Sequence, residues 1–155
     1  MRNKQKGFSL IELLIVVAII LIIAAIAIPN LLRSKIAANQ ASAVGSLRTL
    51  NTACIAYSTS YGQFPGSLAS LGPMASGGTA SSTSADLIDS VLAAGSKSGY
   101  TFGFTAGAAN QSYTITATPI TVGTTGQNMY FTDQSGVIRV NTSGAGAAAT
   151  STPIG

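Results

Sequence analysis

Residues 7–29 read GFSLIELLIVVAIILIIAAIAIP. Between Phe8 and Ile28 the polar residues are Ser9 and Glu12, and Glu12 is the one charged side chain. At ~1.5 Å per residue, a helix of this length spans roughly 30 Å, which is enough to cross the hydrocarbon core of a bilayer. The sequence therefore predicts a helix that can sit in a membrane and that carries a single carboxylate near its start.

A short basic segment with Arg2, Lys4 and Lys6 precedes the apolar run. Because positive residues beside a membrane helix tend to stay in the cytoplasm, we expect this tail to remain inside while the rest of the chain is exported. A secretory signal peptide begins in the same way, and Ala25-Ile26-Ala27 offers a small-x-small site for a cut before Ile28.

The length and content of the apolar run weigh against a secretory signal peptide. The run is longer than the usual apolar core, Glu12 would be unfavourable inside it, and Pro29 would lie just past the cut. A permanent single-pass anchor is the other alternative. It leaves Glu12 without a role.

The segment Gly7-Phe8-Ser9-Leu10-Ile11-Glu12, followed by an aliphatic run that ends at Pro29, resembles the class III signal sequence of type IV pilins and the related pseudopilins. In that family a membrane aspartic protease, the prepilin peptidase, cuts after the glycine and methylates the new amino terminus. The resemblance implies cleavage between Gly7 and Phe8 and N-methylation of Phe8. It is confined to the amino-terminal part of the chain.

The predicted assembly site consists of Phe8 and Glu12. Cleavage would create a cationic amine on Phe8, four residues before Glu12 and on the same face of a helix. A carboxylate at the centre of a membrane helix costs roughly 2.5 to 3.5 kcal/mol on insertion scales, so a cation at the same depth is a preferred partner. The resemblance implies that Glu12 of an incoming subunit pairs with the Phe8 amine of a neighbour and thereby sets the axial register.

The same resemblance implies the other partners and the location. They are further copies of this chain in a homopolymer, the prepilin peptidase, and a pilus assembly machinery with a cytoplasmic ATPase motor. The precursor is expected in the inner (cytoplasmic) membrane and the assembled subunit in an extracellular filament.

Pro29 removes a backbone donor and is predicted to kink or locally melt the helix, or to mark a boundary. Beyond it few helix breakers occur before residue 62. Apolar residues recur there at three- and four-residue spacing, which predicts an amphipathic continuation of the helix over 29–61. The predicted stripe consists of Leu47, Leu50, Cys54, Tyr57 and Tyr61.

Residues 62–99 are predicted to be a connecting loop with one short helix. Ser84 is the expected cap and Asp86 the acidic residue of the first turn, and the helix is expected to end at Gly95. Its expected buried side chains are Leu87, Ile88, Val91 and Leu92.

An antiparallel β-meander is predicted over 100–141, followed by a flexible tail over 142–155. The expected turn between the last two strands is 133–136. The four expected strands are 100–106, 111–118, 128–132 and 137–140. The predicted fold class is therefore α+β, a long amino-terminal helix with a small sheet packed on its second half, which is also the pilin architecture. The predicted segments are the leader 1–7, the membrane or filament-core helix 8–28, its continuation 29–61, the loop 62–99, the meander 100–141 and the tail 142–155.

The composition describes one small domain with a membrane segment, since 8% of the 155 residues are charged and 46% are hydrophobic. The formal charge of +4 depends on the leader. Its removal leaves five basic and four acidic side chains, a formal charge of +1. No basic patch for nucleic acid survives, so nucleic acid is not expected to be a strong direct partner.

No catalytic, cofactor-binding or metal-ligating residue is predicted, and we do not expect an enzyme. The chain has no histidine and no phosphate-binding loop, and Gly103 to Gly107 only loosely resembles a nucleophile elbow. Asp86 and Asp89 supply two carboxylates, which is few for calcium and its roughly six to eight oxygen ligands. Helix capping explains them better.

Other polar positions have open interpretations. The single cysteine, Cys54, excludes an internal disulfide and lies on the predicted apolar stripe, where a buried thiol is expected. Arg33 and Lys35 follow the membrane segment and face lipid headgroups, a neighbouring subunit or solvent. Two sequons begin at Asn110 and Asn141 and are acceptor sites only if the cell has the glycosylation enzymes.

The sequence thus predicts a type IV pilin-like subunit, most simply a major pilin, that polymerises into an extracellular filament. Three alternatives stay open. They are a type II secretion pseudopilin, a minor pilin, and a signal-anchored surface module that never polymerises. Adhesion, surface motility, DNA uptake and aggregation are all open to such a filament.

Overall fold

The computed structural model describes residues 7–74 and 78–154. The predicted leader residues 1–6, residues 75–77 of the predicted loop and the last residue of the predicted tail lie outside the described residues. The chain divides into two compact units, Met1–Lys35 and Ile36–Gly155.

One helix, α1, runs from Leu10 to Tyr61 and contains Pro29 in its interior. Its backbone is helical on both sides of Pro29, so the chain is not locally melted there. Proline still removes one hydrogen bond of the helix ladder. A kink at Pro29 stays a prediction.

The second half of α1 has the predicted apolar stripe. Leu47, Leu50, Cys54 and Tyr57 are buried, and Tyr61 is partly buried against the same core. The helix ends where Gly62 adopts a positive φ of 73° and donates its amide to the Ser58 carbonyl over 2.9 Å. Glycine adopts this left-handed conformation without steric cost, which explains the position of the helix end.

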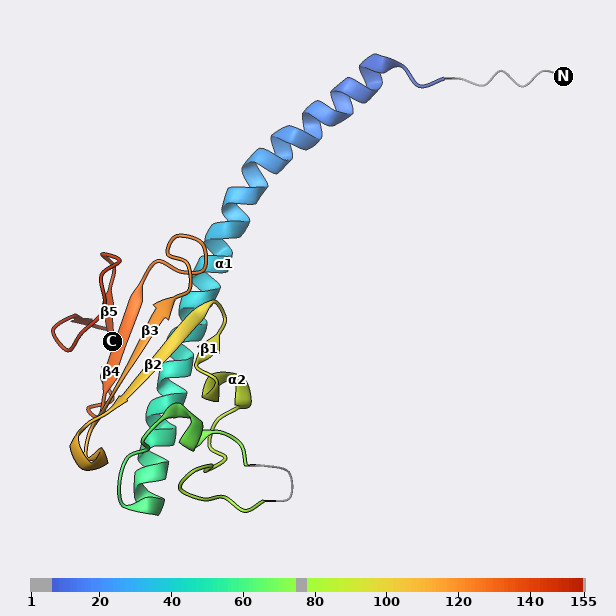
Figure 1. Ribbon diagram of the computed structural model, residues 1–155. Helices are drawn as coiled ribbons and strands as arrows, with labels where there is room; N and C mark the ends of the chain where they lie inside the picture. Colours follow the sequence, from blue (N-terminus) through green and yellow to red (C-terminus); the bar gives the residue numbers. More distant parts are fainter. Residues whose placement is uncertain (1–6, 75–77, 155) are drawn as a thin grey trace. The chain divides into compact units, whose positions relative to one another are not determined.

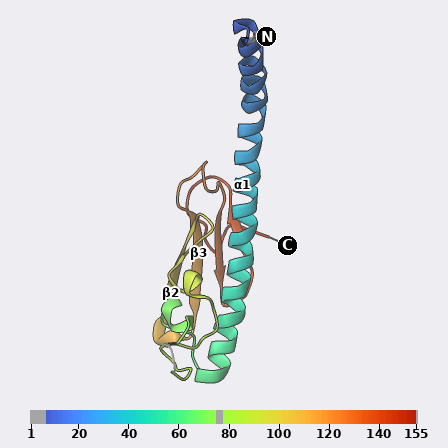
Figure 2. The same ribbon diagram turned by 90° about the vertical axis from the view of Figure 1, so that its right-hand side faces the viewer.

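A six-stranded sheet packs along this part of α1, and each strand is antiparallel to the next (Figures 1 and 2). Its strands follow the order of the chain, as expected for a meander. They are β1 (Ser96–Lys97), β2 (Tyr100–Ala106), β3 (Tyr113–Pro119), β4 (Met129–Asp133), β5 (Arg139–Asn141) and β6 (Thr152–Pro153). The four predicted strands correspond to β2 to β5, and the α+β fold class is confirmed.

The core lies between the helix stripe and one face of the sheet. In β3 the buried residues alternate with partly exposed ones, so Tyr113, Ile115 and Ala117 share the inner face. A buried polar group crosses this core. Asn51 of α1 donates to the Thr132 hydroxyl over 2.8 Å and accepts a hydrogen bond of 3.2 Å from the Tyr113 hydroxyl.

The predicted short helix with Ser84 as its cap is wrong. The observed helix, α2, spans only Ser90–Ala93, and its cap is Asp89, whose carboxylate accepts from the Leu92 amide. The cause is long-range hydrogen bonding. The amides of residues 85–88 donate to carbonyls of residues 70–72, next to the short 3-10 helix η1 (Leu68–Leu71), so they are not available for a helical turn.

Of the four side chains predicted to be buried by this helix, two are buried. Ile88 and Leu92 are buried in the core, whereas Leu87 is 39% exposed and Val91 is 54% exposed. Asp86, expected in the first helical turn, instead has a φ of +54°. Residues 85–88, called the strap below, therefore cross the surface of the core without regular secondary structure.

The ends of the sheet also differ from the sequence prediction, since neither β1 nor β6 was expected. The tail, predicted to be flexible over 142–155, contributes β6, which pairs with β5 through Arg139 and Val140. Ile154 donates its amide to the Ile138 carbonyl and packs against the core. A second 3-10 helix, η2 (Ala108–Asn110), lies in the turn between β2 and β3.

Candidate processing and assembly site

The predicted cleavage point lies in the exposed segment that precedes α1. Gly7, Phe8 and Ser9 are not helical, and the Phe8 side chain is 85% exposed. A peptide bond outside a helix leaves its carbonyl free to enter a protease, whereas a helical one is hydrogen-bonded. The Gly7–Phe8 bond therefore lies in exposed, non-helical backbone.

Gly7 is not required by the surrounding structure. A Cβ at this position would meet no atom within 4 Å, and the φ of Gly7 is not in the left-handed region. If glycine is needed here, the requirement therefore comes from another protein that recognises this residue.

Glu12 lies in the first turn of α1, and its carboxylate binds the backbone of the same chain. The Ser9 amide donates to Glu12 Oε2 over 2.9 Å, and the Leu13 amide donates to the Ser9 carbonyl over 3.3 Å. The Glu side chain thus satisfies a donor that the start of a helix leaves free, as in the capping-box arrangement Ser-x-x-Glu. The spacing of Ser9 and Glu12 was the sequence signal for this role, and the sequence analysis missed it.

The relation of Phe8 to Glu12 differs from the expected one in the uncleaved chain. Because α1 begins at Leu10, Phe8 lies outside the helix, and the two residues are not an i, i+4 pair on a helix face. The physical reason is the cap at Ser9, which ends the helical backbone. Glu12 Oε1 accepts no hydrogen bond within the described residues, so it is free to accept from another group.

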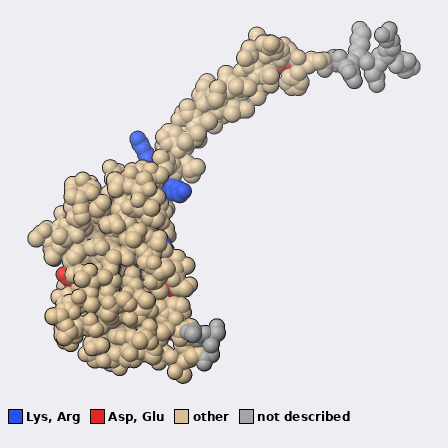
Figure 3. Space-filling model, in the orientation of Figure 1, with Lys and Arg blue, Asp and Glu red and all other residues tan. Residues whose placement is uncertain are grey.

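The first unit exposes its apolar side chains on all sides. None of the large apolar residues between Leu13 and Ile28 is buried. Figure 3 shows residues 8–28 as a surface without charged atoms except for a carboxylate near its start, where Glu12 is the only acidic residue. Among the described residues, α1 is the one helix long and apolar enough to cross a membrane. An apolar surface of this extent requires lipid or other apolar helices around it.

Cys54 and Asp89, which lie outside this site, have structural roles. Burial raises the pKa of the Cys54 thiol to about 12, so it stays protonated and unreactive at neutral pH. The hydrogen bond from Lys97, with a second from the Leu92 amide, lowers the pKa of Asp89. No group of three or more potential metal ligands occurs in the described parts of the chain.

The amino-terminal residues match a known motif. Residues 2–28 match the family model described as a prokaryotic N-terminal methylation motif. The motif covers the Gly7–Phe8 bond, Glu12 and the apolar run. The chain thus carries a prokaryotic N-terminal methylation motif at its amino-terminal end.

Three known proteins illustrate the similarity. The type IV major pilin protein PilA of Myxococcus xanthus is 52% identical over 50 residues, which are 32% of this chain and 23% of that protein. The type IV wide pilus major component PilA4 of Thermus thermophilus is 67% identical over 39 residues, 25% of this chain and 29% of that protein. The type II secretion system core protein G of Aeromonas hydrophila is 33% identical over 64 residues, 41% of this chain and 45% of that protein.

The chain therefore spans less than half the length of each of these relatives. No solved structure is significantly similar to it.

Proposed function

We propose that this chain is a structural subunit, most simply a major pilin, of a type IV pilus-like extracellular filament. The observation that carries the proposal is a helix start that has three features together. A cleavable Gly7–Phe8 bond lies outside the helix, Glu12 follows in the first turn, and an entirely exposed apolar surface comes next. An ordinary membrane anchor needs only the third feature.

Processing is the first proposed step. A prepilin peptidase hydrolyses the bond between Gly7 and Phe8, with the leader keeping the new carboxylate and Phe8 the new amine. N-methylation of Phe8 keeps this amine protonatable. The leader cations Arg2, Lys4 and Lys6 leave with the leader, so the mature chain starts with a single positive charge at the end of an apolar segment.

Assembly is the second proposed step. Glu12 Oε2 retains the Ser9 amide, and Oε1 accepts from the Phe8 amine of a neighbouring copy. Because both charges lie in a layer of low dielectric constant, leaving either one unpaired is unfavourable. This contact selects the axial register at which an incoming subunit stops.

The apolar helix explains why assembly requires a machine. Lipid and a bundle of identical helices are both apolar, so moving the helix from membrane to filament gains little free energy. We therefore propose an assembly machinery with an ATPase motor as a partner, with the inner membrane as the location of the precursor.

A type II secretion pseudopilin is the second candidate, and the similarity to core protein G of Aeromonas hydrophila favours it. Such a subunit would form a short periplasmic assembly in place of a surface fibre. The major pilins are more similar over their matched residues, at 52% and 67% identity against 33%. A signal-anchored module that does not polymerise is the third candidate, and it assigns no role to Glu12 beyond capping.

The test is to shear the cell surface, pellet the filaments and determine the amino terminus of this chain by mass spectrometry. We expect a chain that begins at Phe8, with one methyl group on its amine. A processed chain found only in the periplasm and membranes would favour the pseudopilin. A chain that still carries its leader and stays in the membrane would overturn the proposal, and a start at Ile28 would identify a secretory signal peptide.

A further inference from the structure

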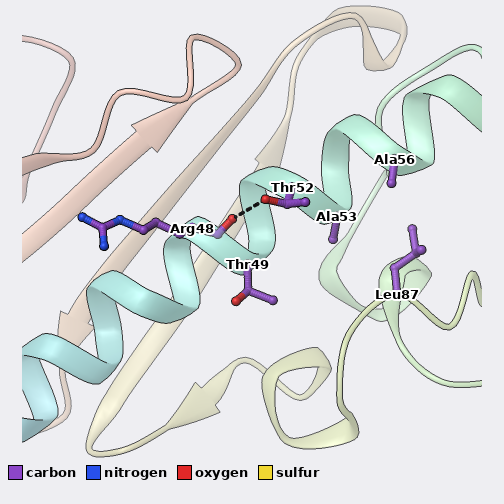
Figure 4. A pocket seen from close by; sticks show the side chains of 6 residues that line it. All are labelled: Arg48, Thr49, Thr52, Ala53, Ala56 and Leu87. Carbon is purple, nitrogen blue, oxygen red and sulfur yellow. Dashed lines mark hydrogen bonds between the residues drawn. The ribbon is translucent and has the colours of Figure 1, made fainter.

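A shallow groove of about 380 Å³ lies on the second unit, between the outer face of α1 and the strap that carries Leu87. Figure 4 shows its lining, with the Arg48 side chain at one end of the row of α1 residues and Leu87 facing the helix near the other end. The lining residues are Arg48, Thr49, Thr52, Ala53, Ala56 and Leu87.

The surface in and around the groove is apolar although it faces outward. Leu87, which lines the groove, is 39% exposed, and Ile55, which lies between the lining residues Ala53 and Ala56 in the sequence, is 55% exposed. Complete burial of each of these side chains against a partner is favourable by about 1.5–3 kcal/mol.

The hydroxyl groups of the groove need no partner. Thr49 donates to the Gly45 carbonyl over 3.1 Å, and Thr52 donates to the Arg48 carbonyl over 3.0 Å, as the dashed line in Figure 4 shows. Because both hydroxyls are hydrogen-bonded within the helix, covering them leaves no donor unsatisfied. The groove can therefore be buried at little polar cost.

The second unit contains few charged side chains, and most of them have a structural role. Asp89 pairs with Lys97 at 2.8 Å. Asp133 accepts from the amide and hydroxyl of Ser135 in the β4–β5 turn. Arg139 donates to the Ser151 carbonyl and holds the tail.

Arg48 and Asp86 are the two charged side chains of this unit that remain. Neither makes an ion pair or a side-chain hydrogen bond within the described residues. Arg48 lines the groove, and Asp86 directly precedes Leu87, which also lines it. One cation unpaired among the described residues therefore lines the groove, and one such anion directly precedes a lining residue in the sequence.

From this charge complementarity we infer that the groove is an interface between copies of this chain, in which Arg48 of one subunit pairs with Asp86 of the next. The apolar residues Leu87 and Ile55 are covered by the same contact. This inference rests on the proposed filament and adds a contact between the second units to the one made by Phe8 and Glu12.

The test compares four full-length chains in a host that processes them and assembles filaments. They are wild type, Arg48→Asp, Asp86→Arg and the double exchange. We expect each single reversal to lower the yield of sheared filaments at least about tenfold, because like charges then meet at the contact. The double exchange should restore most of the yield. The matched control is Lys97→Asp, a charge reversal whose partner Asp89 belongs to the same chain, and it should not be rescued by Asp86→Arg.

A cross-linking experiment tests the pair without relying on yield. Two chains are co-expressed, one with Arg48→Cys and the other with Asp86→Cys, and the filaments are oxidised. A disulfide-linked dimer on a non-reducing gel is the expected result. Native Cys54 is fully buried and does not interfere. Thr59→Cys replaces Arg48→Cys as the control, because Thr59 lies on a similar helix face about 16 Å further along the helix.

The outcomes separate this inference from the proposed function. Wild-type filaments that begin at Phe8, together with single reversals that assemble normally and no specific cross-link, would overturn the interface and leave the filament proposal intact. If the wild-type chain forms no filament, the proposed function fails and the interface fails with it. Rescue by the double exchange, or the specific dimer, supports the interface.

Discussion

The Ser9 amide donates a hydrogen bond of 2.9 Å to the Glu12 carboxylate, so the residue proposed for subunit contact also caps the helix in its own chain. These two roles use different oxygens. Oε2 accepts from the Ser9 amide, and Oε1 accepts no hydrogen bond within the described residues and is the oxygen of the proposed contact. The cap also orients the carboxylate toward the amino-terminal end of α1, which is the end where cleavage would create the positive charge.

Substitution of Glu12 separates the two roles. Glu12→Gln keeps an oxygen that accepts from Ser9 but removes the charge, whereas Glu12→Ala removes both. We expect both variants to be processed and to remain in the membrane, with filament yield lowered at least about tenfold, since an unpaired Phe8 amine is costly in an apolar layer. Sheared filaments and membrane fractions are compared by immunoblot. Normal filaments from Glu12→Gln would show that only the cap matters.

Gly7→Ala tests whether a peptidase recognises the glycine. The space around Gly7 is open, so the change is expected to leave the fold and the membrane insertion intact. We expect the chain to keep its leader, and the filaments to be lost. Mass spectrometry of the membrane fraction gives the amino terminus. Efficient cleavage of this variant would mean that the glycine is not the recognition element.

Asn51→Ala tests the buried polar group between α1 and the sheet. The change leaves the hydroxyls of Tyr113 and Thr132 without Asn51 as a partner in a buried site. We expect a loss of about 2–4 kcal/mol in the free energy of unfolding. Thermal unfolding of the full chain in detergent, followed by circular dichroism, measures it.

The matched control for Asn51→Ala is Thr59→Ala, an exposed change on the same helix. Thr59 only donates to the Ile55 carbonyl of its own helix. It should cost less than about 0.5 kcal/mol. Equal effects of the two substitutions would contradict the role of Asn51.

The stability of the chain should fall at high pH. Burial raises the pKa of Cys54 from 9.0 to about 12 and that of Tyr100 from 10.0 to about 12. Between the unfolded and folded pKa values the unfolded chain has lost the proton and the folded chain has kept it, so stability decreases as pH rises. The contribution of Cys54 is complete below pH 9.0 and is lost by about pH 12.

The melting temperature in detergent, measured from pH 7 upward, checks this pH dependence. We expect a plateau and then a decrease from about pH 9 onward, the unfolded pKa of the thiol. Cys54→Ala should lower the plateau through the cavity it leaves, and should shift the onset of the decrease toward the unfolded pKa of tyrosine, 10.0. A constant melting temperature up to pH 11 would contradict the protonated, buried thiol.

Local patterns account for the parts of the structure that were predicted correctly. The stripe of Leu47, Leu50, Cys54 and Tyr57 follows from helical spacing, and the inner face of β3 follows from alternation. Both patterns are set by neighbouring residues and therefore appear in the sequence. The same holds for the apolar run and its single carboxylate, whereas cleavage between Gly7 and Phe8 stays a prediction.

The errors occurred where distant residues compete for the same backbone groups. Residues 85–88 have a composition typical of a helix start, yet their amides bind carbonyls of residues 70–72. The tail has a composition typical of a flexible segment, yet β6 pairs with β5. In both cases the hydrogen-bond partner lies far along the chain, so no local spacing indicates it.

The sequence was sufficient for the amino-terminal helix, its carboxylate and the order of the main strands, because each depends on residues close together in the chain. Only the tertiary structure decided that Glu12 caps α1 through Ser9, that Leu87 and Val91 are exposed, and that Arg48 lines a groove without an ion-pair partner among the described residues. Those facts depend on which atoms remain unsatisfied once the core has formed, and a linear pattern does not contain that information.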